Sequence, residues 1–332
     1  MPENEKVEDV EIGIELPFEK PIGKIYSQIT ELESQQIATG RDFSREIREL
    51  RTRYVSLMRK TYSSLTEWET VQVARHPNRP LAQDYLRSMV KNFVELHGDR
   101  HYSDDRAIVG GFGQIGMEKL LLISQEKGRG TSEKVEHRFG MSQADGYRKA
   151  LRLMKLAEKF GLPVVTLIDT AGAYPGIESE ERSVAEAIAV NLREMSRLRT
   201  PIICVIIGEG GSGGALGIGV GDRIAILQYA YYSVISPEGC ASILWRSAEK
   251  ADEAAAALKL TAKNLKALGV VDDIINEPLG GAHRNASEAI RNVEQYVIGM
   301  IRRLKSIDID TLLQQRYDSW RARGKVLQGE KT

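Results

Sequence analysis

The stretch "GEGGSGG" at residues 208–214 contains two overlapping patterns that could support chemistry. Gly208, Gly210 and Gly213 form the G-x-G-x-x-G fingerprint of dinucleotide sites, in which glycines let a pyrophosphate approach a helix N-terminus. Gly210, Ser212 and Gly214 form the G-x-S-x-G pattern that presents a nucleophilic serine. The two patterns predict different reactions, so the surrounding sequence must decide between them.

The context disfavours a dinucleotide site. That fingerprint requires a full crossover helix after the glycines, but "ALGIGVGD" at 215–222 is short and contains three more glycines, which are costly inside a helix. Glu238, the acidic residue at a suitable distance, lies in "SPEG", which is typical of a helix start and not of a strand end.

A serine hydrolase remains an alternative. Its nucleophile would be Ser212, with His283 as the only downstream histidine and Asp222, Asp272 or Asp273 as the acid. Against it, the hydrolase fold normally places more strands before its nucleophile. A serine among four glycines is also explained by its small size.

A third interpretation uses the backbone alone, and the sequence favours it. Glycines without a Cβ let a substrate oxygen approach main-chain N–H groups, and a helix start adds its dipole. The preceding strand ends in a similar turn, "DTAGAYPG" at 169–176. Two such turns at adjacent strand ends can aim one amide each at a single oxygen, which is an arrangement suited to stabilising an oxyanion or enolate.

The elements around these turns indicate an α/β fold. The apolar runs 163–169 and 201–207 predict buried strands, each preceded by a helix, at 142–160 and 180–198. We expect Ser142 to cap the first helix and Gly161 to end it. The repeated helix–strand–glycine turn unit predicts parallel strands. Segments 106–116 and 118–126 predict a strand pair, and further strands are expected near 223–227, 231–236 and 270–276, with a long helix over 285–305.

The two ends of the chain differ from this pattern. Residues 1–23 predict an extended arm because Pro2, Pro17 and Pro21 resist helix formation. Two helices then follow, and they form either a partner-facing hairpin or a cap on the main core. "RHPNRP" at 75–80 marks a boundary. We therefore expect an N-terminal arm and hairpin (1–75), a main domain (76–306) and a polar, frayed C-terminal tail (307–332).

Composition excludes several classes of protein. Lys+Arg and Asp+Glu number 46 each, so the chain has no electrostatic footprint for DNA. The two cysteines, Cys204 and Cys240, form no C-x-x-C pair and predict neither a zinc site nor disulfides. The acidic N-terminus is unlike a signal peptide, and no apolar run reaches membrane-span length. We expect a cytoplasmic protein that neither binds a membrane nor holds a metal.

Long blocks of the sequence resemble one known family. "LPFEKPI", "HGDRHYSDDRAIVGG", "IDTAGAYPG", "EERSVAEAIAVNLREMSRL", "VIIGEGGSGGALGIGVGD", "YYSVISPEGCASILW" and "EPLGGAHRN" are similar to the alpha subunit of the acetyl-CoA carboxylase carboxyltransferase. The resemblance covers nearly the whole chain. It implies a crotonase-like fold, a superhelix of β-β-α units, preceded here by the N-terminal helical extension.

The resemblance also implies an activity and partners. The reaction is carboxyl transfer from carboxybiotin to acetyl-CoA, which forms malonyl-CoA for fatty acid synthesis. The implied assembly is an α2β2 heterotetramer, in which the beta subunit carries a zinc ribbon. Biotin is attached to a separate biotin carboxyl carrier protein and is charged by a separate biotin carboxylase, so no cofactor is expected covalently on this chain.

Carried onto this sequence, the resemblance implies an oxyanion hole for the ureido oxygen of carboxybiotin. It implies that Gly210 and Gly211 supply this hole and that Gly172 and Ala173 form the partner turn. Residues expected to contact substrate are Ser212, Gly213, Tyr174, Lys127 and Arg129.

The sequence departs from the family pattern at four places next to these turns. Ser124–Gln125 stand where glycine and histidine are usual, and Ala171 stands where proline is usual. Ser142–Ala144 replace a proline-bearing segment, and Ser183–Val184 replace glycine and glutamine. These departures motivate another alternative, a non-catalytic assembly subunit.

Overall fold

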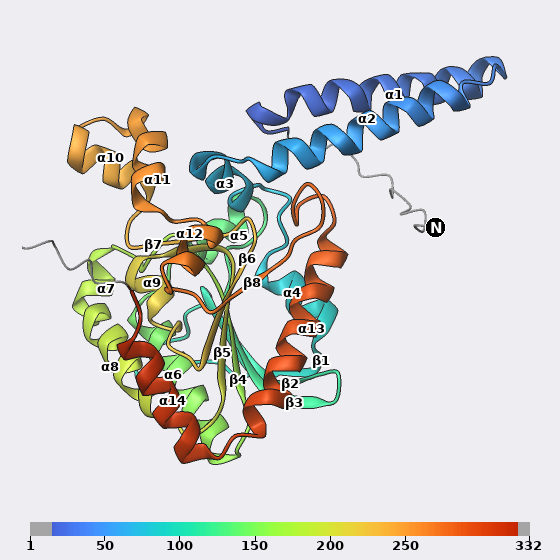
Figure 1. Cartoon of the computed structure of the whole chain (residues 1–332). Helices are drawn as coiled ribbons and strands as arrows, with labels where there is room; N and C mark the ends of the chain where they lie inside the picture. The colour runs from blue at the N-terminus through green and yellow to red at the C-terminus, as the bar shows by residue number, and fades with distance from the viewer. Residues whose placement is uncertain (1–14, 325–332) are drawn as a thin grey trace, which may run out of the picture.

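The computed structural model describes residues 15–324, which are built around one eight-stranded mixed sheet (Figure 1). The strand order is β1-β2-β3-β4-β5-β6-β8, and β7 pairs with the end of β5. The bounds are β1 Lys91–Glu95, β2 Ile108–Ile115, β3 Glu118–Gln125, β4 Val164–Thr170, β5 Ile202–Gly211, β6 Arg223–Leu227, β7 Tyr231–Ser233 and β8 Asp273–Ile275.

The sheet confirms the predicted strand pair and the predicted parallel unit. β1, β2 and β3 pair antiparallel, whereas β3 to β6 and β8 run parallel. Every residue of β4 and β5 is buried, as their unbroken apolar runs require when helices cover both faces of a sheet.

Helices cover the two faces of the sheet (Figure 1). One face carries α6 (Ala144–Lys159), α8 (Val184–Arg197) and α14 (Ile309–Arg321), and the other carries α4 (Ala82–Met89) and α13 (Ala286–Lys305). None of the helices within the described residues is long and apolar enough to cross a membrane.

Three local predictions need correction. Helix α6 begins at Ala144, because the Ser142 hydroxyl donates to Asp105 Oδ2 at 2.7 Å and does not cap the helix. The predicted helix over 180–198 is two helices, α7 (Ile177–Glu181) and α8, separated at Ser183, whose φ is +61°. The predicted strand over 201–207 continues through the glycines to Gly211, so these glycines extend the sheet before the turn begins.

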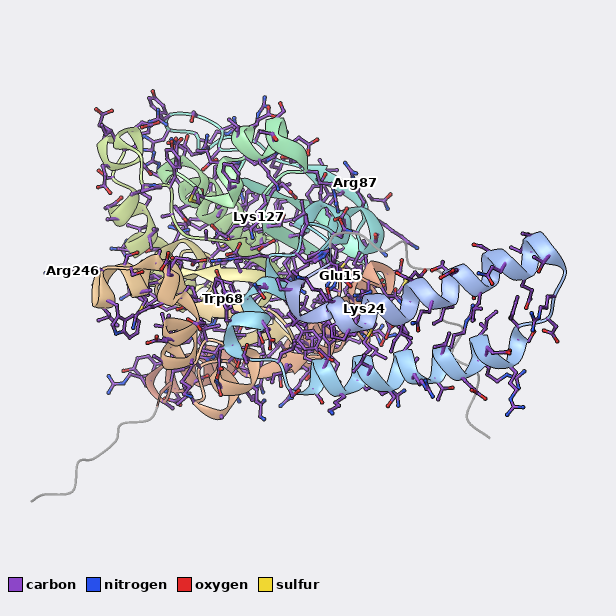
Figure 2. All side chains as sticks on the ribbon, turned by 90° about the horizontal axis from the view of Figure 1, so that it is seen from above. Glu15, Lys24, Trp68, Arg87, Lys127 and Arg246 are labelled. Atoms are coloured by element: carbon purple, nitrogen blue, oxygen red, sulfur yellow. The ribbon has the colours of Figure 1, made fainter. Side chains whose placement is uncertain are left out.

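The N-terminal region forms a helical hairpin that projects from the body (Figures 1 and 2). After the short 3-10 turn Pro17–Glu19, α1 (Lys20–Thr39) packs against α2 (Ser44–Ser63). The extended arm predicted over 1–23 is therefore wrong from Pro17 onward, and residues 1–14 lie outside the described range. Pro21 is tolerated because it lies in the first turn of α1, where its missing N–H has no partner to lose.

The hairpin joins the body at its base, and α3 (Glu67–Ala74) continues from it. The rings of Tyr62 on α2 and Tyr229 beside β6 meet edge to face at 5.4 Å. In Figure 2, Glu15 and Lys24 mark this base, whereas the far end of the hairpin extends beyond the body. Of the two alternatives, the structure shows a hairpin, and a partner on it stays a prediction.

The stretch expected to be a C-terminal tail contains α14 instead. Arg316 of this helix is 1% exposed and forms two 2.7 Å contacts with the Asp222 carboxylate. Its guanidinium also donates to the carbonyls of Met195, Leu198 and Thr200. This fully bonded arginine holds a mostly polar helix on the body, which hydrophobic patterning alone does not reveal.

Five further short helices belong to the fold: α5 (Gly130–Glu136), α9 (Ser212–Leu216), α10 (Pro237–Trp245), α11 (Ala251–Leu258) and α12 (Ala262–Ala267). Thiols Cys204 and Cys240 are both free.

Candidate active site

The two glycine turns pack main chain against main chain. The first turn follows β4 at 170–173, and the second leads from β5 into α9 at 210–214. A Cβ on Gly211 would overlap the carbonyl of Ala171, and one on Gly214 would overlap Gly172 and the nitrogen of Ala173. The predicted meeting of the turns at adjacent strand ends is confirmed, and Gly211 and Gly214 are required by this packing alone.

Two other glycines of the turns face open space. Nothing lies within 4 Å of a Cβ built on Gly172, and the only atom within that distance of one built on Gly213 is the Ile188 side chain at 3.7 Å. Neither glycine has a positive φ. The fold therefore does not require glycine at these two positions, which leaves room for a ligand to approach the backbone there.

The main-chain donors of the first turn are partly used. Gly172 N–H donates to Thr170 Oγ1 at 3.1 Å, and Tyr174 N–H donates to the Ser142 carbonyl at 2.9 Å. Within residues 15–324, no protein atom accepts from the Ala173 N–H. Ala173 is thus the available donor of this turn.

The donors of the second turn are divided by strand geometry. Gly210 lies opposite Tyr232 of β7 and Thr170 of β4, and Gly211 lies opposite Ser233. Successive N–H groups of a strand point to opposite edges, so only one of Gly210 and Gly211 can face a given substrate oxygen. The second donor for that oxygen must come from the other turn or from the unpaired first N–H groups of α9.

A buried ionic network lies directly behind the turns. Lys127 Nζ is 2.6 Å from Asp169 Oδ1 and 2.7 Å from Glu209 Oε1. The other oxygen of Glu209 binds Arg75 Nε at 2.8 Å and the Tyr231 hydroxyl at 2.5 Å. Figure 2 labels Lys127 on the body of the molecule, away from the hairpin. The network fixes the strand end, because Asp169 Oδ1 also accepts from the Glu209 N–H at 2.9 Å, one residue before Gly210.

The network stays charged at neutral pH. Burial alone would raise the pKa of Glu209, but Lys127 and Arg75 hold it at about 2. Burial would lower the pKa of Lys127, and its two carboxylate partners raise it instead. Neither group is poised to exchange a proton near pH 7, so neither serves as a general base.

The remaining predicted site residues have distinct positions. Ser212 is exposed with a φ of +52°, and Tyr174 follows Ala173 with its ring 5.7 Å from the Arg138 guanidinium. Arg129 precedes α5 and pairs with Asp84 of α4. The structure thus brings Ser212, Gly213 and Tyr174 to the turns, whereas the cations of Lys127 and Arg129 are each held by carboxylates of the chain. Substrate contact by these five residues stays a prediction.

A hydrolase triad is not assembled within the described residues. The His283 ring stacks on His76 at 4.0 Å, and its nearest carboxylate is Glu19 at 3.9 Å. The three candidate acids bind other groups: Asp222 binds Arg316, Asp272 binds Arg323, and Asp273 binds the Tyr296 hydroxyl. Ser212 therefore lacks a base, and the hydrolase alternative is set aside. Residues 15–324 also contain no cluster of three or more His, Cys, Asp or Glu side chains placed to hold a metal.

Sequence reasoning missed the ionic network. Glu209 stands inside the glycine motif, where a carboxylate next to a strand end is a usable signal. Arg75 offers no such signal, since its contact with Glu209 joins positions 134 residues apart.

Comparison with known proteins identifies what this chain resembles. The family model "Acetyl co-enzyme A carboxylase carboxyltransferase-like" matches residues 15–324. Acetyl-coenzyme A carboxylase carboxyl transferase subunit alpha of Coxiella burnetii is 52% identical over 310 residues, covering 93% of this chain and 98% of the relative. The protein of the same name from Azotobacter vinelandii is 51% identical over 311 residues, covering 94% and 98%.

Solved structures confirm the crotonase-like fold class. The transcarboxylase 12S chain superposes with a TM-score of 0.54 at 17% identity, over 76% of this chain and 44% of that one. The beta subunit of geranyl-CoA carboxylase from P. aeruginosa gives a TM-score of 0.54 at 16% identity, over 74% and 46%. This chain thus spans less than half of either solved chain, and at these identities the likeness supports the fold alone.

Proposed function

The chain belongs to the family of acetyl-coenzyme A carboxylase carboxyl transferase alpha subunits, and on this premise we propose that its paired glycine turns bind the oxygen that becomes negative during carboxyl transfer. The proposed reaction moves a carboxyl group from carboxybiotin to acetyl-CoA and forms malonyl-CoA for fatty acid synthesis.

We propose that the chain acts with separate partners. A beta subunit with a zinc ribbon completes an α2β2 complex, and the biotin is presented by its carrier protein after charging by biotin carboxylase. The zinc is assigned to the beta subunit, not to this chain. Biotin, when presented, supplies a ureido nitrogen that carries the carboxyl group and a ureido oxygen that gains negative charge as the group leaves.

The contribution of this chain is main-chain hydrogen bonding. One amide of the Gly210–Gly211 strand end and the Ala173 amide beside Gly172 donate to the ureido oxygen. In well-studied enzymes, one such donor is worth about 10²–10³ in rate. Ser212, Gly213 and Tyr174 border the ring, and Lys127 and Arg129 stay candidate contacts to the remaining substrate. No side-chain base of this chain is needed, which agrees with the occupied state of Lys127 and Glu209.

The observation that carries this proposal is the open space above Gly172 and Gly213. Both glycines lie in turns at the carboxyl ends of the parallel strands β4 and β5, and at such a place a ligand that needs the Cα uncovered explains a glycine that neither backbone conformation nor packing requires. The fit to a ureido oxygen rests on the Ala173 N–H of the first turn, whose nitrogen lies beside Gly214 of the second turn and which has no acceptor among the described residues.

The test uses substitutions that the fold accepts. Gly172→Ala and Gly213→Ala add a methyl group into open space, so we expect a folded subunit that still joins the beta subunit. Transfer from malonyl-CoA to free biotin by the reconstituted complex should fall about a hundredfold, because the methyl group blocks approach to the amides. Gly299→Ala, on α13 and equally open, is the matched control and should leave transfer unchanged. Full activity in both turn variants would refute the oxyanion site.

Gly211 and Gly214 are poor tests of the same idea. A side chain at either position would collide with backbone atoms of the facing turn, so any loss of activity would follow from misfolding.

We propose a catalytic subunit and not a purely structural assembly protein. Two of the departures from the family pattern, at Ser142 and Gln125, take part in the hydrogen bonding near the turns. Ser142 donates to Asp105, and the buried Gln125 side chain contacts the backbone at Asp169 and Gly214. The same glycine variants decide this alternative, since an assembly protein would tolerate them without any change in transfer.

A further inference from the structure

We propose that Gln125 is a positioning residue that holds the two glycine turns at a fixed separation, an inference that rests on the function proposed above. Gln125 is the last residue of β3 and is fully buried. Its side-chain Nε2 donates to the Gly214 carbonyl at 2.8 Å, and its Oε1 accepts from the Asp169 N–H at 3.2 Å. A single amide group therefore bridges the end of β4 and the first turn of α9.

Both contacts are made to backbone atoms next to the proposed donors. Asp169 lies four residues before Ala173, and Gly214 lies three residues after Gly211. The Gly214 carbonyl also accepts from the Tyr147 hydroxyl at 3.3 Å, so α9 is anchored from two sides. Because oxyanion donors must hold their aim to within a fraction of an ångström, the length of this bridge decides whether both amides reach one oxygen.

The chemistry of the bridge is specific. It needs one donor and one acceptor on a rigid group, both uncharged. An apolar side chain offers neither, whereas a neutral imidazole offers one of each. A protonated imidazole has two donors and cannot accept from the Asp169 N–H. A histidine at position 125 is therefore expected to form the bridge at high pH and to lose it on protonation.

The experiment compares three variants in the complex reconstituted with the beta subunit. Gln125→Leu should lower kcat about tenfold or more, with the KM for malonyl-CoA within about twofold, because the substrate is still bound while the donors lose their aim. Gln114→Leu is the matched control, because Gln114 also donates one 2.8 Å amide bond to a carbonyl, that of Gly116 in the β2–β3 turn. It should leave kcat unchanged.

Gln125→His supplies a readout that a merely structural role would not move. The ratio of its kcat to that of the unmodified complex should be close to one at pH 8. The ratio should fall on acidification as the imidazole becomes protonated. This fall is expected below about pH 6.5, the ordinary pKa of histidine, and at a lower pH where burial depresses that pKa. The other titratable groups around the bridge are Tyr147, Lys127, Asp169 and Glu209. They are common to both proteins, so the ratio removes their contribution.

The outcomes separate the two proposals. If Gly172→Ala and Gly213→Ala leave transfer unchanged, the oxyanion site falls, and the role of Gln125 falls with it. If those variants lose activity while Gln125→Leu keeps kcat, only the positioning role is overturned. If Gln125→Leu does not fold, Gln125→His decides at pH 8, where its imidazole is neutral and can bridge the two turns, and a kcat about tenfold or more below that of the unmodified complex at this pH overturns the proposal.

Discussion

Acidification is expected to loosen the junction between the N-terminal hairpin and the body, through one buried histidine. His283 lies at the base of the hairpin with 4% of its side chain exposed, stacked on His76 and 3.9 Å from Glu19. Burial is the largest cause that lowers its pKa, His76 acts in the same direction, and Glu19 opposes them. The net result is a pKa of about 4 against an ordinary value of 6.5.

The magnitude follows from this difference. Above pH 6.5 the histidine is neutral in both the folded and the unfolded chain, so it has no effect on the pH dependence. As the pH falls from 6.5 toward 4, only the unfolded chain takes up the proton, and the free energy of unfolding falls by about 1.36 kcal/mol per pH unit. Between pH 6.5 and 5 the loss attributable to His283 is about 2 kcal/mol.

The assay is urea unfolding at a series of pH values, for the unmodified chain and for His283→Gln. Burial raises the pKa values of Glu126 and Asp222, so these two groups stabilise the folded protein as the pH falls. The informative quantity is therefore the difference in the free energy of unfolding between the two proteins at each pH. Exposed His97, changed to glutamine, is the control. Equal slopes in the unmodified chain and in His283→Gln would refute the reasoning, as would a stability of the unmodified chain relative to His283→Gln that rises as the pH falls from 6.5 to 5.

Three further outcomes are expected. Arg316→Leu should lower the free energy of unfolding by about 3–5 kcal/mol, because it leaves a buried carboxylate unpaired, whereas exposed Arg291→Leu should change it little. In the native chain, a thiol reagent should modify Cys240 and spare Cys204, since complete burial raises the pKa of Cys204 to about 12; equal rates would contradict this. Ser212→Ala should reduce carboxyl transfer only modestly, and labelling of Ser212 by a fluorophosphonate would contradict the absence of a base.

The strands that lead to the site were predictable because the local sequence of each strand indicates that it is buried. β4 and β5 are apolar along their whole length, and a parallel strand covered on both faces must have that composition. Their carboxyl ends meet at one edge of the sheet, so the encounter of the two glycine turns followed from the same pattern. The strand pair β2 and β3 was predictable for a similar local reason.

Contacts between distant segments could not be predicted in this way. Ser142 has the residue type and spacing of a helix cap, but its hydroxyl donates a hydrogen bond to Asp105, which lies 37 residues earlier. Arg316 looks like a surface residue in a polar stretch until Asp222 and three carbonyls enclose it. In each case tertiary packing determines the hydrogen-bond partner, and the local sequence does not indicate which residue it is.

The glycine motif by itself does not distinguish the glycines that folding requires from the glycines that binding requires. Gly211 and Gly214 are required by backbone contact between the turns, whereas Gly172 and Gly213 face open space. The chain cannot place amides next to a substrate without first bringing its own two turns into contact, so the packing glycines are a precondition for the open ones. The packing glycines and the open glycines are the same residue type, so the sequence does not tell them apart. Substitution at the open positions separates the role in binding from the role in folding.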